Sequence, residues 1–406
     1  MADELVRGLR PGKADPRRAS DARVSRLVIQ PTEYRSRIDT FRRALVESEV
    51  EAAVLSSRSN VIYFAGLRFD PLWSSATRSL IAVIPADGPV QLVLPGFIAE
   101  EAADLWPEAE VHSYQGPPDS VVPAVSSALR RAGSGRRVAF EMGPDSRIGF
   151  TLDEWTALRE SLPGCELVDA QALIWPVRVV KSPAEIEALR VAAHAASAAF
   201  QEVFARPITG RSEREVARDI YAASLRNGAD SVGWMAATSG QGSYNRFVSG
   251  PRDRIIERDD LFWADVGVLT SGYWTDVCRA VVAGPISERR HELQTAVVAA
   301  TQAGIDAIRP GVPIATVAEA VRTRATELKL PMIGYGRLGH GIGLSATEPP
   351  SVAEWDLTIL KEGMVITVEP AVEDETGIYC AEQVVAVTSR GADVLSIAPT
   401  HLVEGR

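Results

Sequence analysis

The chain has 406 residues, a mean hydropathy of zero and a formal net charge of −10 at pH 7. This length predicts two domains rather than one. The acidic balance has no basic stripe, so nucleic-acid binding has no electrostatic support, and no apolar run is long enough to span a bilayer. The three cysteines, Cys165, Cys278 and Cys380, form no disulfide pattern, and a cytoplasmic location is therefore the expectation.

The N-terminal part changes character after about thirty residues. Residues 1–30 mix arginine with acidic residues and have no apolar core, so we expect a flexible extension and not a secretory signal. Beyond them, apolar segments of strand length alternate with amphipathic segments of helical length. The expected helices cover residues 33–50, 98–105, 120–132 and 152–162, and the expected strands residues 52–56, 80–84, 90–94, 138–140 and 167–168. This alternation predicts a mixed α/β domain over residues 31–175, with a sheet flanked by helices.

A second domain is expected over residues 176–406, and it opens with a strong helix start. Ser182 can cap the helix, a proline follows at the first helical position, and Glu185 can reach back to the cap. Ser212 opens a second expected helix in the same way.

The order of elements in this domain repeats. After the two helices come a strand and an acidic hairpin, and then two more helices and a second acidic hairpin. The expected strand covers residues 231–238, and the second pair of helices residues 291–308 and 316–328. The pattern helix, helix, hairpin thus occurs twice, which predicts an internal duplication with one carboxylate pair from each half on a shared sheet.

The first acidic hairpin lies in residues 261–276. Both arms are rich in β-branched and aromatic residues, as strands are. Folding the segment about Thr270 and Ser271 places Asp265 opposite Asp276. Like charges that face each other on a sheet repel, and burying them without partners adds a larger cost.

The second acidic hairpin lies in residues 364–382. Folding it about Glu375 and Thr376 places Glu369 opposite Glu382. Two such pairs in one chain predict bound positive charge between them, and a pair of divalent metal ions is the simplest candidate.

A fifth candidate ligand stands between the hairpins. His340 is one of five histidines and the only one in a glycine-rich, helix-free setting, Gly-His-Gly-Ile-Gly. Four carboxylates and one imidazole suit Mn, Fe or Co at least as well as Zn, and they differ from a thiolate zinc site. The alternative is that both hairpins and the histidine are solvated surface features without a metal.

These segments resemble a known family. The second domain is similar to the pita-bread metallopeptidases: methionine aminopeptidase, aminopeptidase P, prolidase and their relative creatinase. The first domain more loosely resembles the creatinase-type domain that precedes the catalytic domain in aminopeptidase P and prolidase. The matching stretches are residues 60–66, 177–190, 265–267, 272–279, 339–344, 348–350, 369–370 and Glu382. The resemblance implies an α/β (α+β) protein with a creatinase-like N-terminal domain and a pita-bread domain with a pseudo-twofold ααβ repeat.

The resemblance also implies roles for the five residues. Asp265 and Asp276 would chelate one ion, His340 and Glu369 the other, with Asp276 and Glu382 reaching both. Water between the ions would be the nucleophile, and Glu369 would shuttle its proton. Creatinase has lost these ligands and works without metal, whereas all five are present here. A homodimer, with the N-terminal domain of one subunit over the site of the other, is implied as well.

The sequence departs from the family at two positions. Peptidases of this family carry two histidines that hold the substrate and donate to the developing oxyanion, and Val248 and Thr347 stand in their places. Valine has no donor, threonine is a weak substitute, and loss of one such donor typically costs roughly 10²–10³ in rate. Thr347 is the candidate that remains for this catalytic role. The candidate substrate-binding residues are Tyr244, Arg246, Val248, Tyr335 and Arg337, the last two for an anionic substrate.

We therefore expect a dinuclear metal-dependent hydrolase that cleaves an amide or other C–N bond, most like an Xaa-Pro aminopeptidase or dipeptidase. A second hypothesis is hydrolase or lyase chemistry on a non-peptide small molecule, as in creatinase, the ectoine hydrolases and the dimethylsulfoniopropionate lyases. A third is a non-catalytic binding role, as in the pita-bread domains of histone chaperones. The expected partners are a short peptide or small molecule and two divalent ions (Mn, Co, Fe or Zn), with no nucleic acid and no membrane.

Overall fold

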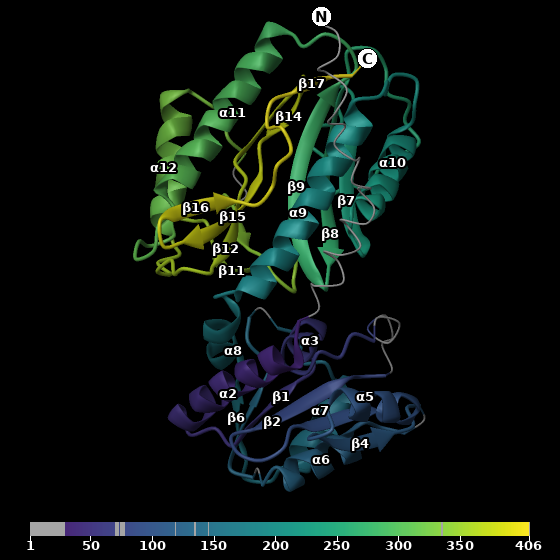
Figure 1. Cartoon of the computed structure of the whole chain (residues 1–406), viewed down its shortest axis with the longest axis vertical. Coiled ribbons are helices and arrows are strands. Elements are labelled where there is room, and N and C mark those ends of the chain that lie inside the picture. The colour runs from purple at the N-terminus through teal and green to yellow at the C-terminus, as the bar shows by residue number, and fades with distance from the viewer. Residues whose placement is uncertain are drawn as a thin grey trace, which may run out of the picture.

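The computed structural model describes residues 29–69, 73, 78–117, 119–133, 135–144, 146–333 and 336–405. Most of the extension predicted for residues 1–30 lies outside the described residues. The described part confirms the predicted mixed α/β class. Two domains are stacked along the long axis of the molecule and joined by α8 (Gln171–Arg178) and the start of α9 (Pro183–Phe204) (Figure 1). The predicted boundary at residues 175/176 falls inside α8.

The N-terminal domain is built on a six-stranded mixed sheet in the order β4-β3-β2-β1-β5-β6. Its strands are β1 (Ala52–Leu55), β2 (Ile81–Pro85), β3 (Gln91–Pro95), β4 (Glu110–Tyr114), β5 (Arg137–Phe140) and β6 (Glu166–Asp169). Its helices are α2 (Pro31–Glu47), α3 (Arg58–Ala65), α5 (Ala99–Leu105), α6 (Val122–Arg131) and α7 (Leu152–Glu160), with a short 3₁₀ turn, η1 (Gly96–Ile98), before α5.

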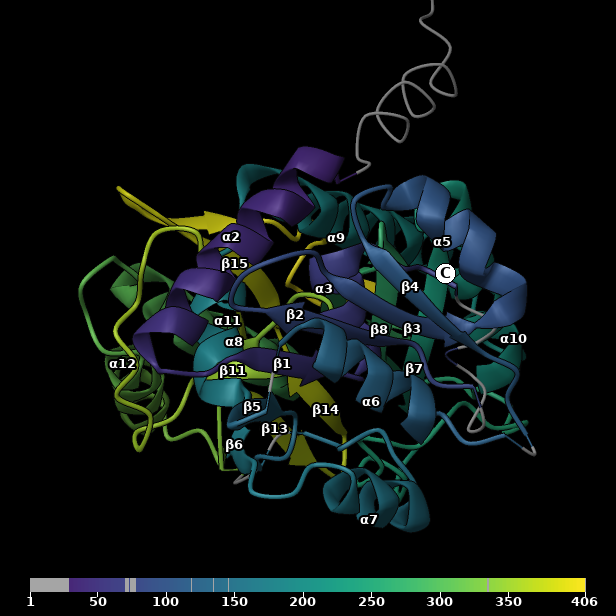
Figure 2. The ribbon, with the colours of Figure 1, turned by 90° about the horizontal axis from the view of Figure 1, so that it is seen from below.

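Helices cover both faces of this sheet. On one face, Leu55 and Ile84 pack with the apolar residues of α2 and α3; on the other, Val54 and Val83 pack with those of α6 and α7. In the view from below, α6 lies on the side of the sheet that faces away from the C-terminal domain (Figure 2). Burial on both faces explains why β1 and β2 are continuous apolar runs without polar alternation.

Three elements of this domain were not expected from the sequence. Every residue of α3 from Asn60 to Ala65 is buried, so the helix has no polar stripe to mark its period. Strand β4 has a polar sequence because it lies at the edge of the sheet. Helix α8 contains Pro176, which argues against a helix in a reading of sequence alone.

The C-terminal domain follows the predicted order of elements. Its helices are α9, α10 (Glu213–Arg226), α11 (Glu288–Ala307) and α12 (Ala315–Glu327). Its strands are β7 (Ser231–Ser239), β8 (Leu261–Thr270), β9 (Tyr273–Val282), β10 (His340–Gly341), β11 (Glu348–Ser351), β12 (Val365–Val368), β13 (Ala371–Asp374), β14 (Gly377–Cys380), β15 (Gln383–Thr388), β16 (Gly391–Val394) and β17 (Val403–Glu404). Among the described residues, no helix is both long and apolar enough to cross a membrane.

The two helix starts predicted in this domain are confirmed. The Ser182 hydroxyl accepts from the Glu185 amide at 3.2 Å, and the Glu185 carboxylate accepts from the Ser182 amide at 3.0 Å. Ser212 and Glu215 make the same reciprocal pair at the start of α10. Helix α9, the longest of the described helices, then packs along β8 and β9 (Figure 1).

The expectation that both hairpins share one sheet is wrong: among the described residues, the two hairpins lie in different sheets. Strands β17-β9-β8-β7 form one sheet, β11-β10-β12-β15-β16 a second and β13-β14 a separate ribbon. β14 and β15 contact β9 without a hydrogen-bonded ladder between them. The physical reason lies at Glu369-Pro370, where the second hairpin leaves its sheet, since proline has no N–H to continue a ladder.

The register of the first hairpin also differs from the expectation. Asp265 pairs with Cys278 and Asp276 with Gly267, so the two aspartates are diagonal neighbours rather than direct partners. The turn is Ser271-Gly272, with φ of +53° and +83°. Positive φ at both central residues is the signature of the two-residue type I′ turn, which matches the twist of the strands. Both aspartates still project from one face, because their positions differ by an even number of residues along the ladder.

The register of the second hairpin is as expected. Val368 pairs with Gln383 on one side of the break, and Ala371 with Cys380 on the other. The same register therefore sets Glu369 across from Glu382 in the gap between the two ladders. Neither glutamate belongs to a strand, so both side chains stand where β12–β15 gives way to the β13–β14 ribbon.

Candidate metal centre

Three carboxylates from distant parts of the chain meet at the junction of the two sheets. Asp265 comes from the middle of β8, Asp276 from β9 and Glu382 from the segment between β14 and β15. One oxygen of each lies within 4.8 Å of the others, a spacing suited to a shared cation. The expectation that these residues converge thus agrees with the geometry, although Asp265 and Asp276 are diagonal.

One oxygen of each carboxylate in this cluster has no hydrogen-bond partner among the described residues. Asp265 Oδ1, Asp276 Oδ1 and Glu382 Oε1 are buried and accept no hydrogen bond. Burial and the neighbouring carboxylates raise the pKa of all three acids well above the ordinary values. Buried acceptors without donors are rare and costly, and an ion is one of the few explanations. The donor set, hard oxygens with an imidazole beside them, fits a divalent cation.

His340 faces the same cluster. Its Nε2 lies 3.6 Å from Asp276 Oδ2 and 3.5 Å from Glu369 Oε1. Its Nδ1 lies 2.9 Å from the carbonyl oxygen of Gly341, an arrangement that keeps the proton on Nδ1 and leaves the Nε2 lone pair directed at the carboxylates. Such a second-shell hydrogen bond is the usual way in which a metal-binding histidine is oriented.

Glu369 is more accessible than two other members of the group. Its side chain is 26% exposed, against 5% for His340 and 8% for Asp276. Thr367 connects it to the histidine, because the Thr367 hydroxyl accepts from the His340 amide at 3.0 Å and lies 3.4 Å from Glu369 Oε1.

Close backbone packing explains the glycines around His340. A Cβ on Gly341 would overlap the carbonyl oxygen of Pro349, and one on Gly343 would overlap the Glu348 carboxylate. The Gly343 carbonyl accepts from the Trp274 amide at 2.8 Å, which fastens the histidine segment to the tip of the first hairpin. Glycine at these positions lets β10 lie directly against β11.

Arg279 holds the two hairpins together behind the cluster. Its guanidinium donates to the carbonyls of Glu382 at 2.7 Å and Ala398 at 3.0 Å. Cys278 and Cys380 are both buried beside it, and their thiols interact with each other. The pKa of both thiols is raised, and for Cys278 the main cause is burial. Arg279 thus links β9 to the second hairpin, between which there is no hydrogen-bonded ladder among the described strands.

A cavity of about 520 Å³ lies between the two domains, and two of the predicted site residues line it. Thr347 is exposed on its wall, and Arg337 lies half-buried three residues before His340. The charge of Arg337 acts on Asp276 and partly offsets the rise in the pKa of that acid. The cavity is thus linked to the carboxylate cluster through the charge of Arg337, although none of the five candidate ligands lines it.

The remaining candidate residues lie elsewhere. The Tyr244 side chain is buried, and its hydroxyl is occupied by the Leu261 and Gly240 backbone, which gives it a structural role in place of the expected contact with substrate. Arg246 is exposed, Val248 is 95% exposed, and neither lines the interdomain cavity. Tyr335 lies outside the described residues.

Sequence reasoning missed one buried charge cluster at this cavity. Glu348 is bound by Arg178 and, at 3.1 Å, by Lys181, and all three side chains are almost fully buried. Arg178 also donates to the Asn60 side chain at 2.6 Å, so the cluster ties the N-terminal domain to β11. The only signal in the sequence was the acid in Glu348-Pro-Pro beside the histidine motif, and nothing there indicates its two partners.

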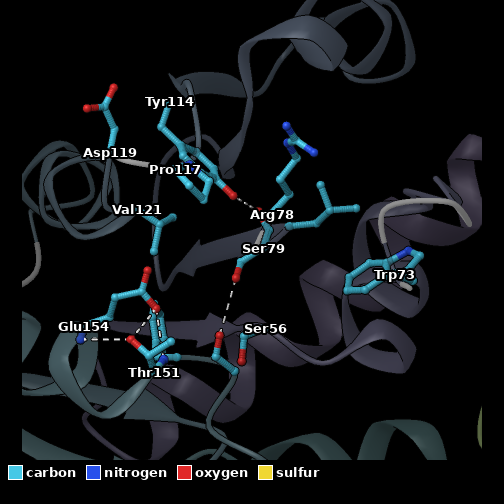
Figure 3. Close-up of a pocket in the computed structure, with 13 residues that line it drawn as sticks. Ser56, Trp73, Arg78, Ser79, Tyr114, Pro117, Asp119, Val121, Thr151 and Glu154 are labelled. Carbon is cyan, nitrogen blue, oxygen red and sulfur yellow. Dashed lines mark hydrogen bonds between the residues drawn. The ribbon is translucent and has the colours of Figure 1, made fainter. Parts of the chain in front are cut away.

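A second cavity, of about 450 Å³, lies within the N-terminal domain (Figure 3). Some polar groups on its wall are occupied locally: Tyr114 donates to the Ser79 carbonyl at 2.9 Å, and Thr151 and Glu154 cap α7. No histidine or cysteine lines it. The chemistry of the molecule therefore concentrates at the carboxylate cluster.

Comparison with known proteins agrees with this reading of fold and site. The description "Metallopeptidase family M24" matches residues 187–394, and "Creatinase/Prolidase N-terminal domain" matches residues 37–180. The Xaa-Pro dipeptidase of Pyrococcus furiosus is 32% identical over 239 residues, which are 57% of this chain and 67% of that protein.

Solved structures give the same result over nearly the whole chain. The dipeptidase PepE of Mycobacterium ulcerans superposes with a TM-score of 0.80 at 26% identity, covering 93% of this chain and 99% of the other. The Xaa-Pro dipeptidase of Bacillus anthracis gives 0.79 at 25% identity, with 91% and 99% covered.

Fold, site geometry and these comparisons together define a metallohydrolase. The chain belongs to metallopeptidase family M24 and carries the creatinase/prolidase N-terminal domain in front of it. The predicted resemblance to the pita-bread metallopeptidases is thereby confirmed, and a metal-dependent peptidase is the activity of that class.

Proposed function

We propose that this protein is a dinuclear metal hydrolase that cleaves an amide bond in a short peptide. The observation that carries the proposal is the set of buried, unpartnered oxygens on Asp265, Asp276 and Glu382, with His340 and Glu369 beside them. Four carboxylates balance the charge of two divalent ions. Asp265, Asp276 and Glu382 are proposed for one ion, and Asp276, Glu382, His340 and Glu369 for the other.

Divalent ions held there supply Lewis acidity, which polarises a carbonyl and acidifies a water molecule. The protein groups do the remaining work. Glu369, which is more exposed than Asp276, is proposed to take the proton from water and pass it to the leaving amine. Thr347, on the wall of the cavity, is the proposed donor to the oxygen of the scissile carbonyl.

The first experiment loads the purified protein with Mn²⁺ and measures bound metal by calorimetry and elemental analysis. About two ions per chain are expected, with loss of at least one in Asp276→Asn and in Glu382→Gln. Fewer than one ion per chain after reconstitution would remove the basis of the proposal. Parallel titrations with Co²⁺, Zn²⁺ and Fe²⁺ identify the preferred metal.

The substrate specificity is the finer part of the proposal. Several relatives are named Xaa-Pro dipeptidases. From the spacing along the sequence, we propose that Thr347 and Val248 stand where peptidases of the pita-bread type carry histidines. We expect low activity on Xaa-Pro dipeptides and a gain of about tenfold or more in kcat/KM for Thr347→His, because an imidazole is the better oxyanion donor. Equal or lower activity in this variant would show that the pocket is not arranged for Xaa-Pro substrates.

The second candidate function is hydrolysis of a non-peptide amide or another C–N bond. Val248 favours it, because this side chain is 95% exposed and has no hydrogen-bond donor with which to hold a peptide. The two candidates separate in one assay. Release of amines from a panel of dipeptides supports the first, whereas turnover of N-acyl or ureido compounds alone, by fully metallated protein, supports the second.

We also propose a homodimer, as in the proteins that this chain resembles. Sedimentation equilibrium on the full chain, with and without Mn²⁺, measures the mass directly. A mass of one chain at micromolar concentration would contradict it.

A further inference from the structure

The cavity between the domains has an unusual balance of polar groups. Its carboxylates are all satisfied by the protein itself. Glu141 accepts from the serine and asparagine donors at the start of α3, Glu348 from Arg178 and Lys181, and Asp356 from two backbone amides at 2.8 and 2.9 Å. Each of these acids thus already accepts hydrogen bonds from the protein, and Glu348 is also paired with two cations.

One cationic donor of the cavity, in contrast, remains open. Within the described residues, Arg337 has no hydrogen bond or ion pair, although its charge acts on Asp276. Two divalent ions would neutralise the four carboxylates of the cluster, so Arg337 would then keep its positive charge. A negatively charged acceptor on a ligand satisfies this donor.

The rim of the same cavity carries an exposed aromatic side chain. Trp355 lines the cavity and is nevertheless 69% exposed. A tryptophan so open to water gains little from packing within the chain, and such a residue at the edge of a concave site is suited to cover an apolar group of a ligand. Arg337 and Trp355 thus offer an anion contact close to the metal centre and an apolar contact towards the entrance.

The size of the cavity allows more than a small dipeptide. About 520 Å³ lies within the range of pockets that enclose drug-sized ligands. Walls from both domains contribute, including Ser59 from the N-terminal side and Ser345 from the C-terminal side. The cavity therefore accommodates a bulky side group in addition to the reacting amide.

We propose that the interdomain cavity is a specificity subsite that selects anionic substrates with a large apolar or aromatic side group. The anionic group binds Arg337, and the apolar group packs on Trp355. The identity of the bond that is cleaved rests on the proposed function, whereas the selection of the ligand does not. Trp355 is thereby assigned as a specificity-determining residue.

The test combines binding and turnover on the full-length, Mn²⁺-loaded protein. Calorimetry compares N-acetyl-L-phenylalanine with its neutral amide and with N-acetylglycine, and turnover is followed with Ala-Phe and Ala-Gly. We expect the wild type to bind N-acetyl-L-phenylalanine at least tenfold more tightly than either analogue. Arg337→Gln is expected to abolish the preference over the neutral amide, and Trp355→Ala the preference over N-acetylglycine.

The control is Leu357→Ala, a change of another exposed apolar side chain two residues away that does not line the cavity. It should retain both preferences. Equal affinity for the three compounds in the wild type, or unchanged preferences in both site variants with intact circular dichroism, would overturn the inference. Failure to hydrolyse any dipeptide, with the binding preferences present, would instead count against the proposed function alone. Hydrolysis of both dipeptides with equal kcat/KM would contradict the subsite.

Discussion

At the scale of single residues, the candidate centre is a group of side chains that destabilises the metal-free protein. Asp265, Asp276 and Glu382 each bury an oxygen that accepts nothing. Desolvation and mutual repulsion raise their pKa values, so that they hold protons more tightly when folded than when unfolded. The free energy stored in this repulsion is released when cations bind, and the site should therefore couple folding to metal.

This coupling predicts a dependence of stability on pH. Unfolded carboxyls titrate near about pH 4, whereas the three clustered acids stay protonated to higher pH in the folded, metal-free protein. The native state therefore binds more protons above about pH 4, and stability conferred by these groups falls as pH rises through their raised pKa values. In EDTA, the double variant Asp276→Asn/Glu382→Gln should have a higher midpoint of thermal unfolding than the wild type. This difference should grow with pH and reach several degrees.

Added Mn²⁺ should invert that comparison. Binding requires deprotonated ligands, so the metal should raise the wild-type midpoint more at pH 8 than at pH 5 and leave the double variant almost unchanged. If the difference in unfolding midpoint between the wild type and the variant changes neither with pH nor with added metal, these acids are solvated and bind no ion.

At the scale of elements, the position of His340 depends on two strands packed backbone to backbone. Gly341 faces the Pro349 carbonyl, and Gly343 faces the Glu348 carboxylate, with no room for a methyl group at either. Glu348 is in turn fixed by Arg178 and Lys181. The histidine is therefore positioned by β11 and by a buried ion cluster, rather than by its own short strand.

We predict that Gly341→Ala lowers the free energy of unfolding by about 1–3 kcal/mol, because a Cβ there forces β10 away from β11. The same displacement moves His340, so Mn²⁺ affinity should fall by about tenfold or more. Urea unfolding and calorimetry measure the two effects. Gly250→Ala is the matched control, since nothing lies within 4 Å of its Cβ position. Wild-type metal affinity in Gly341→Ala would mean that the strand contact does not position the ligand.

At the scale of the whole molecule, a second buried ion cluster joins the domains at the tip of the first hairpin. Arg37 of α2 donates to the Tyr273 hydroxyl at 3.1 Å and lies 3.4 Å from Glu185, and Tyr273 donates to Glu185 at 3.0 Å. Burial raises the pKa of Glu185, and the Arg37 charge opposes that rise. The hairpin that carries two of the proposed ligands is thus anchored on the N-terminal domain.

We expect Arg37→Met to cost about 3–5 kcal/mol, because it leaves Glu185 buried without its cation. Urea unfolding measures the loss, and Arg37→Met/Glu185→Gln should regain part of it by removing the stranded charge. Arg43→Met, an exposed change on the same helix, should alter stability by about 0.5 kcal/mol or less. A single variant as stable as the wild type would show that the domains do not depend on this contact.

Local chemistry was enough to derive much of the fold. Capping boxes at Ser182 and Ser212, amphipathic helices and apolar strands are determined by near neighbours, and they appear where the sequence predicts them. Elements whose character depends on their surroundings were not predicted. In α3, every residue from Asn60 to Ala65 is buried, so no polar face marks the helix. The register of the first hairpin was wrong by one residue at the turn, because backbone φ at Ser271 and Gly272 decides it.

What the sequence by itself determined is the list of charged ligands and their spacing along two hairpins and a glycine-rich segment, since ligand chemistry depends on residue type. Tertiary structure alone decided which of these groups meet, that the hairpins lie in separate sheets, and that Arg178 and Lys181 neutralise Glu348 while Arg337 stays free of ion pairs among the described residues. The physical reason is range: caps and turns involve residues a few positions apart, whereas burial and charge pairing join residues that only the fold brings together.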